Sequence, residues 1–320
     1  MAVAAVIVTY NSADVINSCL EALSKMSPET TTVLVDNASS DNTVDLARAR
    51  GGVRLIANAE NRGFAAATNQ GEKEAGPPHA GESEFILLLN PDVELLTAVD
   101  QLSESARRHG LAAGRLVDHA GRTQAGFTLR RFPTPAALVC ELFGINRLWP
   151  SNPVNRQYRY LDRDLDQPAL VEQPAGAFLM VRRDVWKELS GFDEQFYPVW
   201  FEDVDFCRRA VDAGYHIAYV PSVIGRHEGG HSVGSIPEGR RATYWCVSLL
   251  RYGAKHFQPG AFRWICAAVA LSSVPRMVIG MIAGRTLSTV GIYLKIMRFA
   301  GHCLVTPGHV RNAAIITLNT

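Results

Sequence analysis

The sequence lacks several signatures that would assign it to a common class. Its six cysteines are scattered and form no C-x-x-C pair, which argues against a disulfide framework and against a zinc site. The turn after the first apolar run, TYNSAD, contains no glycine, so a dinucleotide-binding loop is not supported, and no P-loop motif occurs. No basic residues precede the apolar N-terminal stretch, which therefore predicts a first strand and not a signal peptide.

Acidic residues are missing from the last quarter of the chain. Residues 239–320 contain ten Lys and Arg and no Asp or Glu, which leaves 22 basic and all 31 acidic residues in the remainder. The basic part is also apolar, too apolar for a simple phosphate-binding arm, and no nucleic-acid partner is expected. We predict two domains, a catalytic one over residues 1–240 and a helical, membrane-associating extension over 241–320.

The first domain alternates apolar runs with segments of helical periodicity. Beyond residue 110 we expect a hairpin and loop, then a strand-like run with a short helix, a helix over 201–214 and a strand over 215–221. Strands that alternate with helices imply an α/β fold, a mostly parallel twisted sheet flanked by helices. The four predicted strands that establish this pattern cover residues 3–10, 31–36, 53–58 and 85–90.

Polar residues follow each of these four strands. Ligands bind at the carboxyl edge of such a sheet, where all four strand ends meet. Each end alone is ordinary turn chemistry, but together they predict a polar site. A carboxylate after the second strand can accept from a pyrimidine N–H, and one after the fourth can hold a divalent cation beside a diphosphate, as in a nucleotide-sugar site. The four ends are Thr9-Tyr10-Asn11, Asp36-Asn37, residues 58–64 and Asn90-Pro91-Asp92.

Five sequence blocks resemble a known family. They are VTYNSADVINSCLEAL, VDNASSDNT, NRGFAAATNQG, LLNPDVEL and the long block from AGAFLMVRRDVW to GFDEQFYPVWFEDVDFCRRAVDAGY. In this order, over residues 3–235, they are similar to the family 2 inverting glycosyltransferases with the GT-A fold, and most similar to bacterial rhamnosyltransferases. The resemblance implies a dTDP- or UDP-linked sugar donor, with dTDP-rhamnose the first choice, and a saccharide or polyprenyl-linked acceptor of a cell-wall or surface polysaccharide.

The resemblance also implies roles for the strand-end residues. Asp92 would be a ligand of Mg²⁺ or Mn²⁺, although Asn90 stands where the family often has a second aspartate. His227, preferred over His231, would lie near the metal and diphosphate in a flexible Gly-Gly loop. Asp36 would hold the base. The other predicted donor-nucleotide residues are Thr9, Tyr10, Asn11, Asn37, Arg62, Gly63 and Asn90.

The segment FEDVDF places three carboxylates at positions 202, 203 and 205. They can simply favour the positive end of a helix dipole. Alternatively, the preceding Trp200 and Phe201 exclude water, so that a carboxylate keeps a raised pKa and accepts a proton from a sugar hydroxyl. By resemblance Asp203 is the general base, and Glu202 and Trp200 contact the acceptor. One base without a second carboxylate nucleophile implies a single displacement, and hence inversion.

For the basic extension we expect helices in the membrane interface, because Pro275-Arg276 interrupts the apolar run and aromatic residues lie among the basic ones. The predicted location is the cytoplasmic face of the cell membrane, with peripheral or monotopic attachment to anionic lipid. A cap on the catalytic domain, a homodimer contact and a re-entrant hairpin stay open. So do galactofuranosyl or other hexosyl transfer and a non-catalytic saccharide-binding protein. A sugar nucleotidyltransferase would need a triphosphate loop that TYNSAD lacks.

Overall fold

The computed structural model describes residues 2–75, 83–229, 236–282 and 287–306, together with residues 234 and 310. The chain forms two compact units. The first comprises Met1–Phe132, Arg159–Glu194 and Glu202–Ser235, and the second comprises Pro133–Tyr158, Gln195–Phe201 and Ile236–Thr320. The helical unit thus includes two segments that precede the predicted domain boundary at residue 240.

The first unit is built on a sheet that has nine strands in the described residues. Its order is β3-β2-β1-β4-β10-β6-β11-β5, and β8 pairs with β11. The four predicted strands are all present, as β1 (Val3–Thr9), β2 (Thr31–Asp36), β3 (Val53–Ala57) and β4 (Phe85–Leu89). The remaining strands are β5 (Val93–Leu95), β6 (Gly110–Val117), β8 (Ala169–Val171), β10 (Phe178–Arg182) and β11 (His216–His227).

Strand direction decides which chain ends meet at each edge of the sheet. β1 is parallel to β2 and β4, β2 is parallel to β3, and β6 is parallel to β11. β10 lies between β4 and β6 and is antiparallel to both, so β6 runs in the same direction as β4. β5 and β8 are also antiparallel to their neighbour β11. The predicted α/β fold with a mostly parallel sheet is therefore confirmed.

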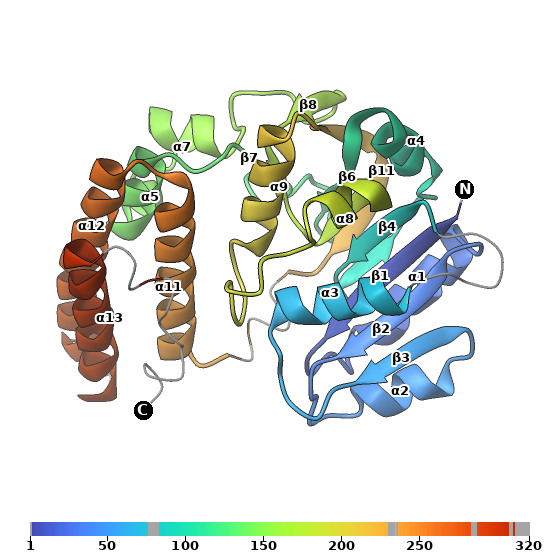
Figure 1. Cartoon of the computed structure of the whole chain (residues 1–320), viewed down its shortest axis with the longest axis horizontal. Coiled ribbons are helices and arrows are strands. Elements are labelled where there is room, and N and C mark those ends of the chain that lie inside the picture. The colour runs from blue at the N-terminus through green and yellow to red at the C-terminus, as the bar shows by residue number, and fades with distance from the viewer. Residues whose placement is uncertain are drawn as a thin grey trace. The chain divides into compact units, whose positions relative to one another are not determined.

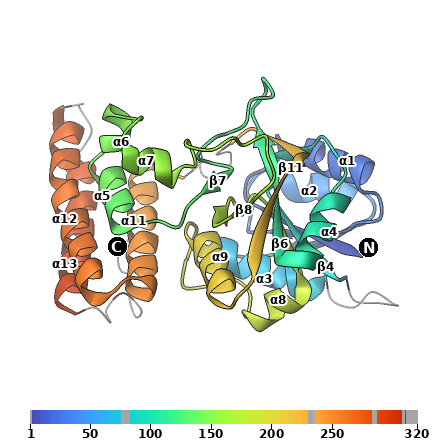
Figure 2. The same ribbon diagram turned by 90° about the horizontal axis from the view of Figure 1, so that it is seen from above.

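Alternate residues of the strands face two helical layers, as the period of two along a strand requires. Ala5 and Ile7 of β1 pack with α1 (Ile16–Met26), α2 (Thr43–Ala49) and α4 (Asp100–His109). Val6 packs on the opposite side, with α3 (Phe64–Glu74), α8 (Arg183–Glu188) and α9 (Glu202–Asp212). In Figure 2, α1 and α2 lie above the strands and α3, α8 and α9 below them.

Strand β11 differs from its predicted end near Pro221. Its pairing with β6 stops at Val220, resumes at Ile224 and continues to Arg226, opposite Val117. Proline lacks the N–H that a ladder needs, and a bulge is a place in a strand that tolerates it. His227 is therefore the last residue of a strand, opposite Val93 of β5, and the prediction that it lies in a flexible loop was wrong. The alternative His231 and the second glycine of the pair lie outside the described residues.

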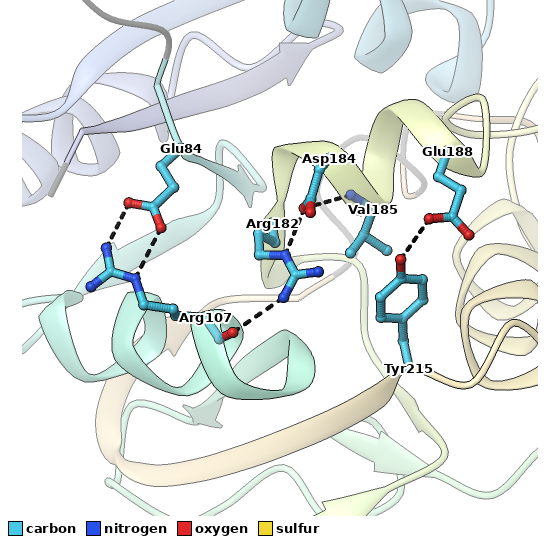
Figure 3. A network of polar contacts seen from close by, with 7 residues as sticks. All are labelled: Glu84, Arg107, Arg182, Asp184, Val185, Glu188 and Tyr215. Carbon is cyan, nitrogen blue, oxygen red and sulfur yellow. Dashed lines mark hydrogen bonds and ion pairs between the residues drawn. The ribbon is translucent and has the colours of Figure 1, made fainter.

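Ion pairs and hydrogen bonds at the surface connect the elements at the amino edge of the sheet (Figure 3). Arg107 of α4 makes a bidentate ion pair with Glu84 (2.9 and 2.6 Å), the residue just before β4. Arg182 bridges Asp184 (2.6 Å) and the carbonyl of Arg107 (3.2 Å), and Tyr215 donates to Glu188 (2.6 Å). Because these contacts gather where β4 and β11 start and β10 ends, they lie at the edge opposite the predicted site.

The second unit is helical. Figure 1 shows α11 (Glu238–His256), α12 (Pro259–Ile282) and α13 (Leu287–Val305) beside α5 (Pro135–Leu142). The shorter α6 (Ile145–Leu148) and α7 (Pro153–Tyr158) follow α5. Helix α12 continues through Pro275. Within the described residues, it is the one helix whose length and composition would allow it to cross a membrane.

Candidate active site at the carboxyl edge of the sheet

The carboxyl ends of the parallel strands meet at one edge, and the reversed strand β10 starts there. The N–H of Asn90, just after β4, donates to the carbonyl of Ala177, just before β10 (2.9 Å). The residue before Ala177, Gly176, donates its N–H to Asp203 Oδ2 (3.0 Å). The turn with Asp92 and the start of α9 with Asp203 are thus connected through two consecutive residues, Gly176 and Ala177.

Asp36 is held at the end of β2 with one acceptor position open. Its Oδ1 accepts from the hydroxyls of Thr9 (2.9 Å) and Ser39 (2.5 Å), and its Oδ2 accepts from the N–H of Ser39 (2.9 Å). Thr9 can make this contact because it lies opposite Asp36 in the β1–β2 register. An ionised carboxylate offers about four acceptor positions. One lone pair of Oδ2 is therefore not used by these contacts, in a residue that is 1% exposed.

The side chains of two predicted nucleotide-binding residues hydrogen-bond to other residues of the protein. Asn11, at a left-handed φ of 50°, accepts from the N–H (2.8 Å) and hydroxyl (3.2 Å) of Ser40. Asn37 donates to the carbonyl of Gly63 (3.1 Å) and accepts from the N–H of Arg62 (3.2 Å). Both amides therefore fix the loops around Asp36, and their predicted contact with a nucleotide stays a prediction.

The remaining predicted donor residues offer different groups. Tyr10 is half-buried and donates its N–H to the Ser12 hydroxyl (3.3 Å). Arg62 is exposed, and its guanidinium makes no hydrogen bond or ion pair with the described residues. Gly63 has a φ of 83°, a conformation that favours glycine. Arg62 thus offers a cationic side chain without a partner among the described residues. The adjacent Gly63 has no side chain that would block a ligand from the main chain.

Asp92 is buried, with one oxygen unsatisfied. The turn closes through the N–H of Val93, which donates to the carbonyl of Asn90 (3.1 Å). The Asp92 side chain is 8% exposed, and its Oδ1 has no hydrogen-bond partner among the described residues. Its Oδ2 lies 3.5 Å from Nε2 of His227. A buried, unpartnered carboxylate oxygen is costly, and it indicates a site completed by something that the protein does not supply.

Two residues that no sequence motif singled out, Gln124 and Phe127, hold His227 in place. Its Nδ1 lies 2.8 Å from Gln124 Oε1, and the ring of Phe127 stacks on the imidazole at 4.7 Å between centroids. Burial lowers the pKa of His227, and the opposing charge of Asp92 does not reverse this. Gln124 and Phe127 fall in the segment expected to be hairpin and loop, where no periodicity or motif singles them out.

Asp92 and His227 fit part of a divalent-cation site. Carboxylate oxygen and neutral imidazole are both accepted ligands of Mn²⁺, and carboxylate oxygen suits Mg²⁺. In the described residues no group of three or more His, Cys, Asp or Glu is placed to hold a metal. Asn90 supplies no carboxylate, so Asp92 and His227 are the two candidate ligands here. A cation at this position would take its further ligands from a diphosphate.

The three carboxylates of FEDVDF have different surroundings. Asp205 is fully buried and paired with Arg209 (2.8 Å), which also binds the carbonyls of Leu189 and Gly191, so it serves the fold. Asp203 accepts from the N–H groups of Gly176 (3.0 Å) and Val204 (2.8 Å). Burial raises the pKa of Asp203, because it outweighs these hydrogen bonds.

Glu202 is 4% exposed, and its Oε2 has no hydrogen-bond partner among the described residues. Burial, followed by the charge of Asp203, raises the pKa of Glu202 well above its usual range. Trp200 and Phe201 directly precede it with left-handed φ values of 80° and 71°, which bulky residues rarely adopt. Trp200 belongs to the second unit and Glu202 to the first, so their shared contact with an acceptor stays a prediction.

The fold is of the GT-A type, as two solved structures show. A solved structure of GalNAc-T7 with UDP, GalNAc and Mn²⁺ is similar over 80% of this chain and 50% of that one, with a TM-score of 0.52 and 15% identity. The mannosyltransferase PcManGT from Pyrobaculum calidifontis, solved with GDP-Man and Mn²⁺, covers 95% of this chain and 87% of its own, with a TM-score of 0.50 and 16% identity.

Sequence relatives then give the family. The profile of glycosyl transferase family 2 matches residues 4–188, and that of glycosyl transferase family group 2 matches residues 169–310. The chain is 30% identical over 270 residues to the N-acetylglucosaminyl-diphospho-decaprenol L-rhamnosyltransferase of Mycobacterium tuberculosis, which covers 78% of this chain and 84% of that one. It is 26% identical over 156 residues to the rhamnosyltransferase WbbL of Escherichia coli, over 47% of this chain and 54% of the relative. The chain belongs to glycosyl transferase family 2 and is a glycosyltransferase similar to bacterial rhamnosyltransferases.

Proposed function

We propose that this glycosyltransferase moves rhamnose, with inversion, from dTDP-rhamnose to a hydroxyl of a lipid-linked saccharide. The observation that carries the proposal is the position of the half-buried Asp203. The N–H of Gly176 orients its carboxylate, and the next residue, Ala177, accepts from Asn90 in the turn that leads to Asp92. A general base at Asp203 and a diphosphate site at Asp92, linked through neighbouring main-chain residues, suit a single displacement at an anomeric carbon. The sugar and the lipid-linked acceptor follow from the similarity to rhamnosyltransferases, one of them named for a decaprenol-linked substrate.

The donor is held by the strand ends. Asp36 accepts from the N–H of a thymine or uracil ring through the open position on Oδ2. The exposed Arg62 reaches a phosphate oxygen. Asp92 and His227 would hold a divalent cation, Mg²⁺ or Mn²⁺, which when bound would supply positive charge beside the diphosphate. Thr9, Asn11 and Asn37 keep these groups in place through their contacts within the protein.

The transfer itself uses Asp203 as general base. The acceptor hydroxyl gives its proton to a carboxylate oxygen of Asp203, its oxygen bonds to the anomeric carbon, and the bond from that carbon to the diphosphate breaks, with the electron pair leaving on the phosphate. Each Asp203 oxygen accepts one main-chain N–H and has a second lone pair for this proton. Burial raises the pKa of Glu202 well above its usual range, which disfavours the charged form that a second carboxylate nucleophile would need, and a single displacement inverts the configuration.

The experiment that tests this function measures binding and product together. Calorimetric titration with dTDP and UDP, each with and without Mn²⁺ or Mg²⁺, should give cation-dependent binding, tighter for dTDP. Incubation with dTDP-rhamnose and a synthetic lipid-linked N-acetylglucosamine should release dTDP and form an inverted linkage, as measured by NMR. Tighter binding of UDP, with transfer of galactofuranose or another hexose, would refute the donor. Failure to bind either nucleotide would refute the transferase and support the non-catalytic alternative.

We further propose that the second unit holds the enzyme at the cytoplasmic face of the membrane as a peripheral or monotopic protein. Helix α12 exposes an apolar stripe at helical spacing, with Trp264 76% exposed and Leu271 and Val278 also exposed. Leu148, at the end of α6, is 88% exposed, and Trp149 follows it. Ten basic and no acidic residues from position 239 onward favour anionic lipid, at about 1 kcal/mol for each basic residue near the surface.

Vesicle flotation tests this attachment. The protein should float with vesicles that contain anionic phosphatidylglycerol and much less with neutral phosphatidylcholine, and added salt should weaken binding. Leu148→Ser with Trp149→Ser should reduce flotation without reducing dTDP affinity. A stable dimer in solution, with no binding to either vesicle, would refute the membrane role and assign the apolar stripe to a second copy of the chain.

A further inference from the structure

Gln124 contacts His227 at two points, and together these contacts fix the protonation pattern of the imidazole. Gln124 Nε2 lies 2.8 Å from the main-chain carbonyl of His227, and Gln124 Oε1 lies 2.8 Å from Nδ1 of the ring. A carbonyl oxygen only accepts, so the amide must turn its NH₂ group toward it. The amide oxygen therefore faces the ring, and Nδ1 must be the nitrogen that carries hydrogen.

The other ring nitrogen then has a defined chemistry. In a neutral imidazole with hydrogen on Nδ1, Nε2 presents a lone pair. Nε2 lies 3.5 Å from Asp92 Oδ2, whereas a charge-assisted N–H···O bond is about 2.7–2.9 Å long. This longer distance is the one expected when Nε2 and Oδ2 both present lone pairs and no hydrogen lies between them. The second oxygen of Asp92 also lacks a hydrogen-bond partner among the described residues.

The surrounding groups restrict the ring to this orientation. His227 is 3% exposed and ends a strand that pairs with β5. Phe127 stacks on it nearly in parallel, with 12° between the ring planes. Gln124 is tied in turn by its N–H, which donates to the carbonyl of Leu116 at the end of β6 (3.0 Å). Gln124 thus acts from the sheet itself and not from a free loop.

We propose that Gln124 is a positioning residue that holds His227 in the Nδ1–H form, so that Nε2 and Asp92 together present their lone pairs to a divalent cation. This rests on the proposed function, in which Asp92 and His227 bind that cation. Partners of the distal nitrogen of a metal-binding histidine fix its tautomer and orientation, and their loss typically lowers metal affinity about 10–100-fold.

Mn²⁺ titration, without nucleotide or acceptor, tests the proposal on two variants of the same position. Gln124→Met keeps the length of the side chain but removes the acceptor, and it should weaken Mn²⁺ binding by about 10–100-fold. Gln124→Glu keeps an acceptor for Nδ1–H and should bind Mn²⁺ within a few-fold of the wild type. Gln101→Met, which removes an exposed glutamine that contacts Ser222, is the matched control and should leave the affinity unchanged.

A merely structural role predicts a different pattern, because both variants lose the hydrogen bond to the His227 carbonyl. Equal weakening by Gln124→Met and Gln124→Glu, or none by either, would overturn the proposal. Long-range ¹H–¹⁵N NMR of metal-free protein with ¹⁵N-labelled histidine, assigned with His227→Asn, should show hydrogen on Nδ1 only. Hydrogen on Nε2 would also overturn it. Because neither measurement uses sugar transfer, failure of the proposed function would be recognised separately, by lost nucleotide binding.

Discussion

Asp203→Asn tests the assignment of the general base with almost no change in side-chain shape. In the structure the two carboxylate oxygens accept one main-chain N–H each, from Gly176 and Val204. An amide has only one oxygen, so its NH₂ group must face one of these two donors. The variant therefore loses the base and leaves one buried N–H without an acceptor.

The expected magnitudes follow from these two losses. Removal of a positioned general base typically lowers the rate about 10²–10⁴-fold, which corresponds to about 3–5 kcal/mol in the activation barrier. An unsatisfied buried N–H lowers the free energy of unfolding by about 1–3 kcal/mol. Part of this is offset, because the raised pKa of Asp203 shows that burial disfavours its charged form, and asparagine carries no charge.

The assay compares release of dTDP from dTDP-rhamnose with the affinity for dTDP and Mn²⁺. Asp203→Asn should lower turnover at least about 10²-fold while nucleotide affinity stays within a few-fold of the wild type. The matched control is Asp212→Asn on the same helix, which removes an exposed carboxylate paired with Arg208 and should leave turnover unchanged. Turnover of Asp203→Asn within a few-fold of the wild type would show that Asp203 is not the base.

Four further outcomes are expected from the same region. Gly176→Ala would place a Cβ 3.0 Å from Cβ of Asp203, so that Asp203 must move by a few tenths of an ångström. This displacement of the base should lower turnover without altering dTDP affinity, whereas unchanged turnover would contradict the proposed close approach. Asp36→Asn should weaken dTDP binding, measured by calorimetry, more than it lowers turnover at saturating donor; equal affinity would remove Asp36 from the base pocket. As the pH falls, kcat/KM should decline above the pKa of an ordinary aspartate, about 3.9, because the pKa of Asp203 is raised and the base must be unprotonated. Because burial raises the pKa of Glu202, the wild type should lose stability as the pH rises above the ordinary glutamate value, about 4.3. Glu202→Gln, which carries no charge, should gain stability relative to the wild type over the same rise in urea unfolding, and the opposite trend would refute the raised pKa.

The first half of the sheet could be predicted from sequence because its signals are local. Apolar runs such as FILLL bury every side chain, and the polar residues after them mark the carboxyl edge. Strand β10 could not be predicted in the same way, because an apolar run of five residues does not show which way it runs. Its reversal brings Gly176 to the site, and this depends on pairing with β4 and β6, which are distant in sequence.

The surroundings of His227 could not be predicted either, because they also depend on contacts between residues distant in sequence. The proline at position 221 favours a strand end, and only the bulge that follows Val220 allows β11 to continue to His227. Gln124 is separated from His227 by 103 residues and lies in a segment without periodicity. Among the acidic residues of FEDVDF, Asp205 and Asp203 look alike in sequence, and only the presence of Arg209 beside one and of a main-chain N–H beside the other separates them.

The reversed strand β10 also bears on how such an enzyme can diversify. The hydrogen bond that orients Asp203 comes from main chain, so any residue except proline at position 176 would still supply it, and the constraint there is one of volume and not of chemistry. A base anchored in this manner does not depend on the identity of the side chains beside it. The residues around the turn before β10, apart from Gly176, are therefore free to change with the acceptor while the proton-accepting group keeps its place.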